Sequence, residues 1–146
     1  MAKYEGRKVI ITDHVYAGSS WKSSQNWWTK YNEAYFALLR EFHKQIVIEV
    51  VGHDHYSDLR YHSSFDVCEL SDTAEEFYFH NMFVAPGVTP IDGSNPGVAK
   101  FEITPEFVPT NLEMQFLNLN DTFGQETITY GNLHWNDFNL GSQWGV

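Results

Sequence analysis

The feature that most constrains the fold is an apolar, β-branched run at residues 46–51 that ends at a glycine followed by two histidines. Such a run is typical of a buried strand, and Gly52 lets the backbone turn sharply where the strand ends. His53 and His55 then lie at the carboxyl end of a strand, where open α/β sheets place their sites. Because neutral imidazole binds zinc, iron and manganese, the pattern predicts metal ligation, with two ordinary turn histidines as the alternative.

A helix is predicted between residues 25 and about 45, where apolar side chains recur at three- and four-residue steps. Ser23 or Ser24 is the expected N-cap, because a serine hydroxyl accepts from the free N–H groups of a first turn. We expect the aromatic stripe of this helix to pack on a sheet as core. The stripe consists of Trp28, Tyr31, Tyr35, Leu38, Leu39, Phe42 and Ile46.

A third segment completes a β-α-β unit. Residues 8–12 are predicted to form a short buried strand that ends at Asp13 and His14. A right-handed crossover lays the two strands of such a unit parallel. His14 and His53 are therefore expected at the same edge of the sheet, although they lie far apart in the sequence.

The remaining strands have weaker signals. A turn-rich segment runs from Pro86 to Gly97, and no assignment is made beyond residue 120. The fold class is therefore α/β, with His14, His53 and His55 gathered at one edge of the sheet. The further strands are expected at residues 58–62, 76–84, 98–103 and about 112–116.

Length and charge limit the classes of partner. The 146 residues suffice for one domain with a sizeable core. Nine basic and nineteen acidic residues give a net charge of −10, which repels a phosphate backbone, so nucleic acid is not an expected partner. The single cysteine, Cys68, allows no intrachain disulfide and is expected to be a buried hydrophobe or an unpaired loop thiol. No segment reads as a signal peptide or a membrane span.

Three motifs resemble a known family. Residues 52–55 resemble the last metal-binding motif of the calcineurin-like metallophosphoesterases, Gly-His-x-His. Residues 13–18 resemble the His-x-Pro-Pro-Gly loop of the acid sphingomyelinase-like branch, with Tyr-Ala in place of the two prolines. Residues 84–90, followed by residues 95–97, resemble that branch's Ala-Pro-Ser-x-Thr-Pro…Asn-Pro-Gly segment. Order and spacing agree through residues 8–104.

The resemblance covers only part of the family's domain. Motifs of the types Asp-x-His, Gly-Asp-x-x-Asp and Gly-Asn-His do not occur in this sequence. Residues 1–110 are therefore expected to form the C-terminal half of a metallophosphoesterase domain, a partial sandwich with a mixed sheet and a flanking helix. Residues 111–146 are expected to form a C-terminal extension. If half a domain is absent, an apolar face should lie uncovered, beside Val9 to Ile11 or under the aromatic helix.

The resemblance also implies a chemistry. Members of the family hydrolyse phosphoesters with two divalent metal ions, here expected to be zinc, that share a bridging water and bind the phosphate oxygens. By resemblance, His14 and His53 bind one ion and His55 binds the other. The bridging carboxylate and the general acid belong to the motifs that are absent, so no catalytic residue is expected in this chain, and the isolated chain is expected to be inactive. The implied partners are a phosphodiester or phosphomonoester small molecule, a lipid headgroup, and the chain's own missing N-terminal half.

Two other functions stay open. One is a non-catalytic remnant that binds metal weakly or not at all. The other is an interaction module whose aromatic surface contacts carbohydrate or protein. Relatives are often secreted or lysosomal, but the location of this chain is left open. The aromatic surface would include Trp21, Trp27, Trp135 and Trp144.

Several other polar residues have simpler interpretations. Asp54 is expected either to orient one of its flanking histidines or to be solvated. Asn95 is expected to cap a turn before Pro96. His62 and His80 are expected to be hydrogen-bonded structural histidines, and His43 and His134 to be exposed.

Overall fold

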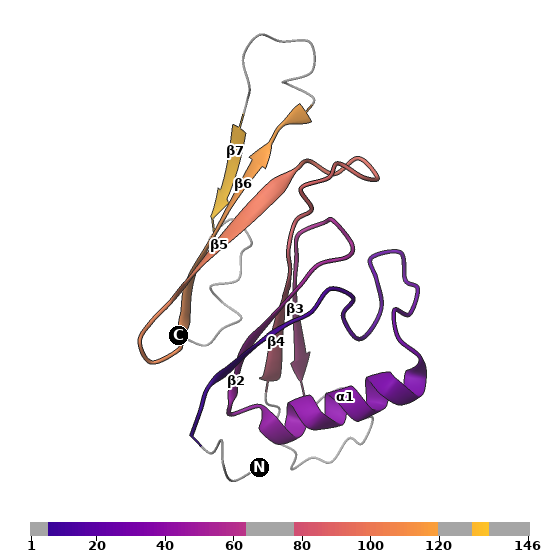
Figure 1. Cartoon of the computed structure of the whole chain (residues 1–146), viewed down its shortest axis with the longest axis vertical. Helices are drawn as coiled ribbons and strands as arrows, with labels where there is room; N and C mark the ends of the chain where they lie inside the picture. The colour runs from indigo at the N-terminus through magenta and orange to yellow at the C-terminus, as the bar shows by residue number, and fades with distance from the viewer. Residues whose placement is uncertain (1–5, 64–77, 120–129, 135–146) are drawn as a thin grey trace, which may run out of the picture.

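The protein has a mixed α/β fold with one helix and two sheets in the described residues, as seen in a computed structural model (Figure 1). The structure describes residues 6–63, 78–119 and 130–134. Cys68, Trp135 and Trp144 lie outside the described residues. The elements in chain order are β1 (Val9–Thr12), α1 (Thr29–Phe42), β2 (Ile46–Val51), β3 (Asp58–Ser63), β4 (Tyr78–Val84), β5 (Gly97–Ile103), β6 (Pro109–Leu117) and β7 (Tyr130–His134).

The first sheet contains the predicted β-α-β unit. Its strand order is β1-β2-β4-β3, in which β1, β2 and β4 run parallel and β3 runs antiparallel to β4. Ile10 pairs with Ile48, and Thr12 pairs with Val50. The carboxyl ends of three strands therefore meet at one edge of the sheet, and the loops that carry the histidines begin there (Figure 1).

The second sheet, β5-β6-β7, is antiparallel and packs on one face of the first. The core between the sheets contains Ile48 and Phe83 from the first sheet and Leu112 and Met114 from the second. Phe83 also meets Phe101 edge to face, with ring centroids 4.8 Å apart. Burial of each such side chain stabilises the fold by about 1.5–3 kcal/mol, so the apolar core between the two sheets holds them together.

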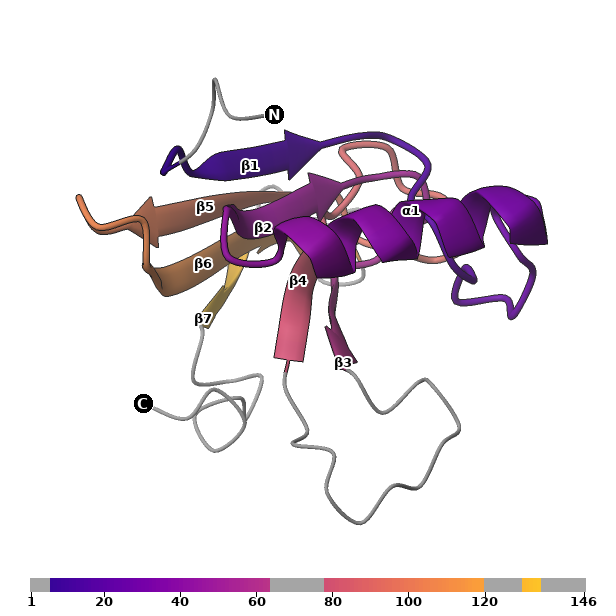
Figure 2. The ribbon, with the colours of Figure 1, turned by 90° about the horizontal axis from the view of Figure 1, so that it is seen from below.

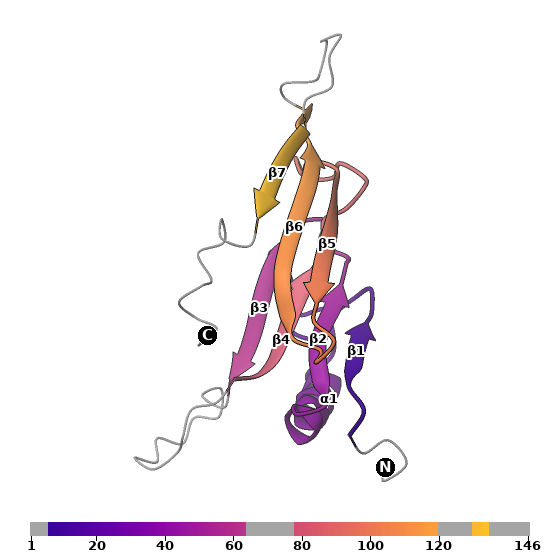
Figure 3. The same ribbon diagram turned by 90° about the vertical axis from the view of Figure 1, so that its left-hand side faces the viewer.

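The opposite face of the first sheet carries α1. Because side chains alternate along a strand, Val51, Met82 and Val84 point away from the second sheet, and they pack with Tyr16 of the loop after β1. In Figure 2, β5, β6 and β7 lie to the left, and α1 crosses in front of β2 and β4 of the first sheet. Figure 3 shows the strands of the first sheet from the edge strand β1 across to β3.

The helix differs from its predicted form at its start. It begins at Thr29 rather than near residue 25, and its N-cap, Trp28, makes no side-chain capping bond. The predicted caps Ser23 and Ser24 are wrong, because both serines belong to a tight loop in which the Ser20 amide donates to the Ser24 carbonyl at 2.8 Å. Ser23 itself has a φ of 61°.

The helix is also rotated relative to the prediction. Trp28, Tyr31 and Leu38 are 76%, 55% and 49% exposed, so the expectation that they form core is wrong. Leu39 is buried as predicted, together with Asn32. The Asn32 side-chain oxygen accepts from the Gly18 amide at 3.0 Å, and its amide group donates to the Trp27 carbonyl. Asn32 therefore ties the start of the helix to the loop, and of the predicted stripe only Trp28, Tyr31 and Leu38 face solvent.

The edge strand β1 is partly uncovered. Val9 and Ile10 are exposed and Ile11 is half-buried, so the prediction of a buried strand at residues 8–12 is wrong. An edge strand has a neighbour on only one side, and the exposed Val9 and Ile10 agree with the predicted bare apolar face. In the described residues no helix is long and apolar enough to cross a bilayer. The division at residue 110 stays a prediction, and β6 spans that position.

Candidate functional site

His14 and His53 meet at the tips of two parallel strands. Their ring centroids lie 5.5 Å apart, and the ring planes make an angle of 81°. The Gly52 amide donates to the His14 carbonyl at 3.1 Å, which continues the β1–β2 pairing past the ends of the strands. A Cβ at Gly52 would lie 3.3 Å from His14 Nδ1, so the glycine allows this close approach. The predicted meeting of two histidines distant in sequence is confirmed.

His55 lies in the same turn with a fixed hydrogen-bond partner. Its Nδ1 is 3.0 Å from the Thr89 carbonyl oxygen. Because a carbonyl only accepts, Nδ1 carries the proton and Nε2 keeps its lone pair. His53 and His55 have φ values of 80° and 62°. Side chains other than glycine occupy this left-handed region at a cost of about 1–2 kcal/mol, and such strain gathers at functional sites.

Asp54, between the two histidines, anchors a neighbouring loop. Its side chain is only 6% exposed, accepts a hydrogen bond from the Tyr16 hydroxyl, and accepts another from the Trp21 amide at 3.2 Å. The Arg60 guanidinium lies 3.9 Å away and stacks over the Tyr16 ring at 4.6 Å. Both expectations for Asp54 are wrong: it is not solvated, and within the described residues it bonds the loop rather than either histidine.

The pKa of the Tyr16 hydroxyl is raised, chiefly because the group is buried. Burial, followed by the hydrogen bond to Asp54, raises the pKa of Tyr16 from about 10 to about 12. Tyr16 itself is fully buried in the small core beneath the loop. The turn that carries His53 and His55 is therefore held to the loop that follows His14 by a neutral phenol and a buried carboxylate.

A second polar cluster lies under α1 and away from the strand tips. His80 Nε2 is 2.5 Å from a carboxylate oxygen of Glu49, and the Tyr35 hydroxyl donates to the other oxygen at 2.9 Å. His80 and Glu49 are buried, and Tyr35 is half-buried. The partial burial of the Tyr35 hydroxyl, followed by the nearby Glu49 charge, raises the pKa of Tyr35. His62 stacks on His80 with ring centroids 5.8 Å apart. The structural interpretation of His80 is confirmed, and Glu49 was missed although it is a lone charge in an apolar run.

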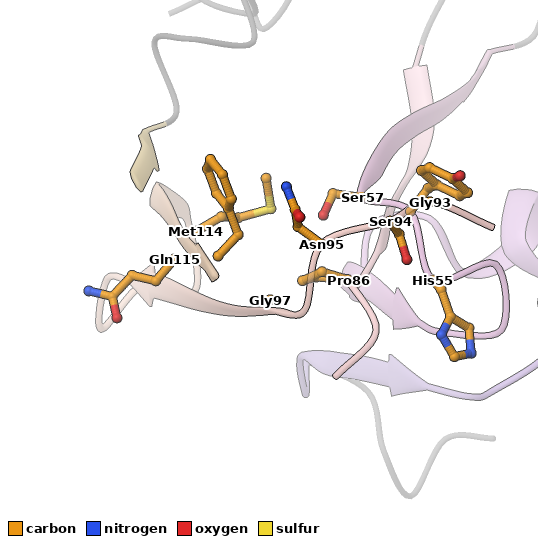
Figure 4. A pocket seen from close by; sticks show the side chains of 11 residues that line it. His55, Ser57, Pro86, Gly93, Ser94, Asn95, Gly97, Met114 and Gln115 are labelled. Carbon is orange, nitrogen blue, oxygen red and sulfur yellow. The ribbon is translucent and has the colours of Figure 1, made fainter. Parts of the chain in front are cut away.

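A cavity of about 380 Å³ adjoins His55. Figure 4 shows Ser57, Ser94 and Asn95 around it, with His55 at one side. The Asn95 side-chain oxygen accepts from the Leu119 amide at 3.1 Å, so Asn95 ties the loop to the end of β6 and the predicted turn cap is wrong. His43 is half-buried, with Nδ1 2.8 Å from the Arg40 carbonyl, so its expected exposure is wrong; the side chain of His134 lies outside the described part.

Comparison with known proteins finds relatives that align with most of the chain. The chain is 28% identical over 144 residues to the mouse acid sphingomyelinase-like phosphodiesterase 3b, covering 86% of this chain and 28% of that protein. The human protein of the same name is 29% identical over 122 residues, covering 82% of this chain and 25% of that protein. The chain is related to the acid sphingomyelinase-like phosphodiesterases. No family model matches it.

A more distant relative adds the same indication. The sphingomyelinase phosphodiesterase D of Dictyostelium discoideum is 22% identical over 158 residues, covering 99% of this chain and 33% of that protein. The chain thus spans about a quarter to a third of the length of the curated relatives it matches. This share is compatible with a partial domain.

The histidines fit part of a metal site. Two imidazoles that share a tetrahedral zinc ion, each with a bond of about 2.0–2.1 Å, have ring centres roughly 5 Å apart, which is close to the His14–His53 separation. Ligating histidines also donate their second ring N–H to a carbonyl or carboxylate, as His55 does. In the part of the chain that the structure describes, no three histidine, cysteine or carboxylate side chains gather as a complete ligand set.

Proposed function

We propose that this chain supplies one wall of the active site of a metal-dependent phosphodiester hydrolase. The observation that carries the proposal is the meeting of His14 and His53 at the tips of two parallel strands, 5.5 Å apart, with His55 in the same turn. The relationship to phosphodiesterases supports the reaction class. Exposed, strained histidines at a sheet edge are poorly explained as structural residues, since His80 shows what a structural histidine in this fold looks like.

In the proposed site His14 and His53 hold one divalent ion, and His55 holds a second through Nε2. Zinc suits imidazole ligands and is the ion we propose. Bound ions of this kind lower the pKa of a water and neutralise charge on phosphate oxygens. The other residues of the site orient the histidines. Gly52 leaves room for the His14 ring next to the turn, and Asp54 holds the turn of His53 and His55 against the loop of Tyr16.

This wall does not make a complete enzyme. Within the described residues, no group of three histidine, cysteine or carboxylate side chains could hold a metal ion by itself. We therefore propose that the rest of the site comes from a segment corresponding to the N-terminal part of the longer relatives. The uncovered apolar side chains of the edge strand β1, Val9 and Ile10, are where such a segment would extend the first sheet.

Hydrolysis assays test this proposal. The 146-residue chain alone should hydrolyse a chromogenic phosphodiester no faster than its His53→Ala variant. The chain co-expressed with the N-terminal part of a relative should turn over the same substrate in a zinc-dependent manner, and His53→Ala or His55→Ala should remove most of that activity. Chelator-sensitive turnover by the chain alone would contradict the proposed division of the site.

The proposed substrate is a phosphodiester or phosphomonoester, either a small molecule or a lipid headgroup. The names of these relatives refer to sphingomyelinase, which is a lipid phosphodiesterase activity. A net charge of −10 disfavours a polyanionic nucleic acid. Comparing turnover of a soluble diester with turnover of sphingomyelin in vesicles would separate the small-molecule and lipid classes.

A second candidate, an interaction module, is favoured by one observation. Trp28 and Tyr31 stand exposed on α1, and with Trp27 they line a hollow of about 440 Å³. Binding of a carbohydrate or protein by this face would not depend on zinc or on His53. A Trp28→Ala variant that loses a partner while His53→Ala keeps it would favour this function over hydrolysis.

A further inference from the structure

The loop after β4, residues 85–90, is clamped onto the turn that carries His55. The Ala85 amide donates to the Val51 carbonyl at 2.7 Å, and the Gly87 amide donates to the His55 carbonyl at 3.3 Å. This loop contains the Pro-Gly-Val-Thr-Pro segment that the family resemblance marked but to which no role has been given. The backbone of this loop therefore reaches His55 from β4, the strand that pairs with β2.

Gly87 leaves the space that the His55 ring fills. A Cβ built at position 87 would lie 2.4 Å from His55 Nδ1, 2.7 Å from its Cγ and 2.9 Å from its Cβ. Atoms cannot approach this closely, so any side chain at position 87 displaces the ring. The φ of Gly87 lies outside the left-handed region. The glycine is thus required for space next to His55 and not for an unusual φ.

Two residues further on, the same loop supplies the partner of the ring. The Thr89 carbonyl oxygen accepts from His55 Nδ1 at 3.0 Å. Val88, between the two positions, is 75% exposed and takes no part. The space at Gly87 and the acceptor at Thr89 both lie next to Nδ1, and together they define the orientation of the imidazole and the nitrogen that carries its proton.

We propose that the loop of residues 85–90 is the positioning element of His55. Gly87 accommodates the ring, and the Thr89 carbonyl holds the Nδ1–H tautomer, so that Nε2 is presented as the free donor atom. This proposal depends on the proposed function in one respect: it names a metal ion as the ligand of His55 Nε2. Gly87 and Thr89 are positioning residues, since they act through His55.

The tautomer of His55 is directly measurable by ¹⁵N NMR of the metal-free chain. Wild type should show His55 with the proton on Nδ1. Thr89→Val should show the same tautomer, because the substitution keeps the carbonyl oxygen. Gly87→Ala should shift the His55 signals toward averaging of the two tautomers, because the displaced ring loses its acceptor. A proton on Nε2 in wild type, or unchanged His55 signals in Gly87→Ala, would overturn the proposal.

A double-mutant comparison separates crowding of His55 from general damage to the loop. Gly87→Ala should lower Tm by roughly 5 °C or more in the wild-type background. In a His55→Gly background, which removes both the ring and the Cβ, the same change should leave Tm level or raise it, since alanine restricts the unfolded chain more than glycine. Val88→Ala is the matched control and should leave Tm unchanged. An equal loss from Gly87→Ala in both backgrounds would overturn the proposal.

Zinc titration then distinguishes this proposal from the proposed function. Suppose that the Nδ1–H tautomer and the double-mutant result hold, but zinc leaves the His55 signals unchanged in the chain co-expressed with the N-terminal part of a relative. The proposed function then fails, and the positioning role stands. If zinc perturbs His55 in wild type but perturbs it equally in Gly87→Ala, the positioning role fails and the proposed function stands.

Discussion

The two groups of histidines in this fold occupy opposite situations. His80 is buried under α1, with its ring bonded to the Glu49 carboxylate. His14 and His53 are exposed at the strand tips, and His53 adopts a left-handed backbone conformation. His80 also has a ring nitrogen without a hydrogen-bond partner, Nδ1, but that atom is buried, whereas the rings of His14 and His53 reach the surface. Burial, rather than residue type, separates the two groups.

The largest expected difference between the groups is in stability. His80→Ala should destabilise the protein by about 3–5 kcal/mol, because it opens a cavity in place of a buried ring and leaves the buried Glu49 side chain with only the Tyr35 hydroxyl as a partner. His53→Ala should change stability by no more than about 0.5 kcal/mol, since the ring is exposed. Urea denaturation of both variants measures the difference. Equal losses would show that the strand-tip histidines are structural as well.

The anchor of the histidine turn should have an intermediate effect. Asp54→Ala should destabilise the protein by about 1–3 kcal/mol, because the buried Tyr16 hydroxyl loses its acceptor. Lys22→Ala is the control: it breaks an exposed pair with Asp92 and should cost no more than about 1 kcal/mol. Thermal or urea unfolding would measure both. A smaller loss for Asp54→Ala than for Lys22→Ala would contradict the anchoring role.

The backbone strain at the site should have a smaller and opposite effect. His53→Gly should stabilise the fold by up to about 1 kcal/mol, since glycine adopts a φ of 80° without steric cost. His80→Gly, in an ordinary strand, should be strongly destabilising. The same unfolding assay applies. A loss of stability on His53→Gly would mean that the ring makes contacts that outweigh the strain.

The last expected effect is a loss of stability at alkaline pH that depends on Tyr16. The pKa of Tyr16 is raised in the fold to about 12 from about 10, so its contribution to stability is complete below pH 10 and is lost as the pH rises toward 12. Unfolding free energies measured between pH 9 and pH 12 should fall for wild type and fall less steeply for Tyr16→Phe. Parallel pH profiles would contradict the buried Tyr16–Asp54 contact.

Local patterns predicted the scaffold well for a definite reason. The β-branched run of β2 and the alternation in β5 reflect burial on one or two faces, and burial is visible in a single sequence. The parallel β1–β2 pair followed from the crossover rule, and with it the meeting of His14 and His53. β7 was not assigned, because Tyr130–His134 carries too few apolar residues for a period to show.

The unpredicted features depend on partners that are distant in sequence. Asp54 is anchored by Tyr16, 38 positions away, and nothing in the residues around either one indicates the contact. Asn32 is buried because it bonds the loop at Gly18, 14 positions away, and the helical period alone does not indicate that contact. The space that Gly87 leaves for His55 likewise joins two loops, and no pattern within either loop reports it.

The central claim is that the strand-tip histidines, and not the buried ones, bind metal. A zinc titration of the ¹⁵N-labelled chain, observed at the histidine ring nitrogens, tests it directly. Zinc should shift the signals of His14 and His53 and leave those of His80 unchanged. His14→Ala should abolish the shift at His53. Zinc-induced shifts confined to other histidines, or a His53 response that survives His14→Ala, would contradict the claim.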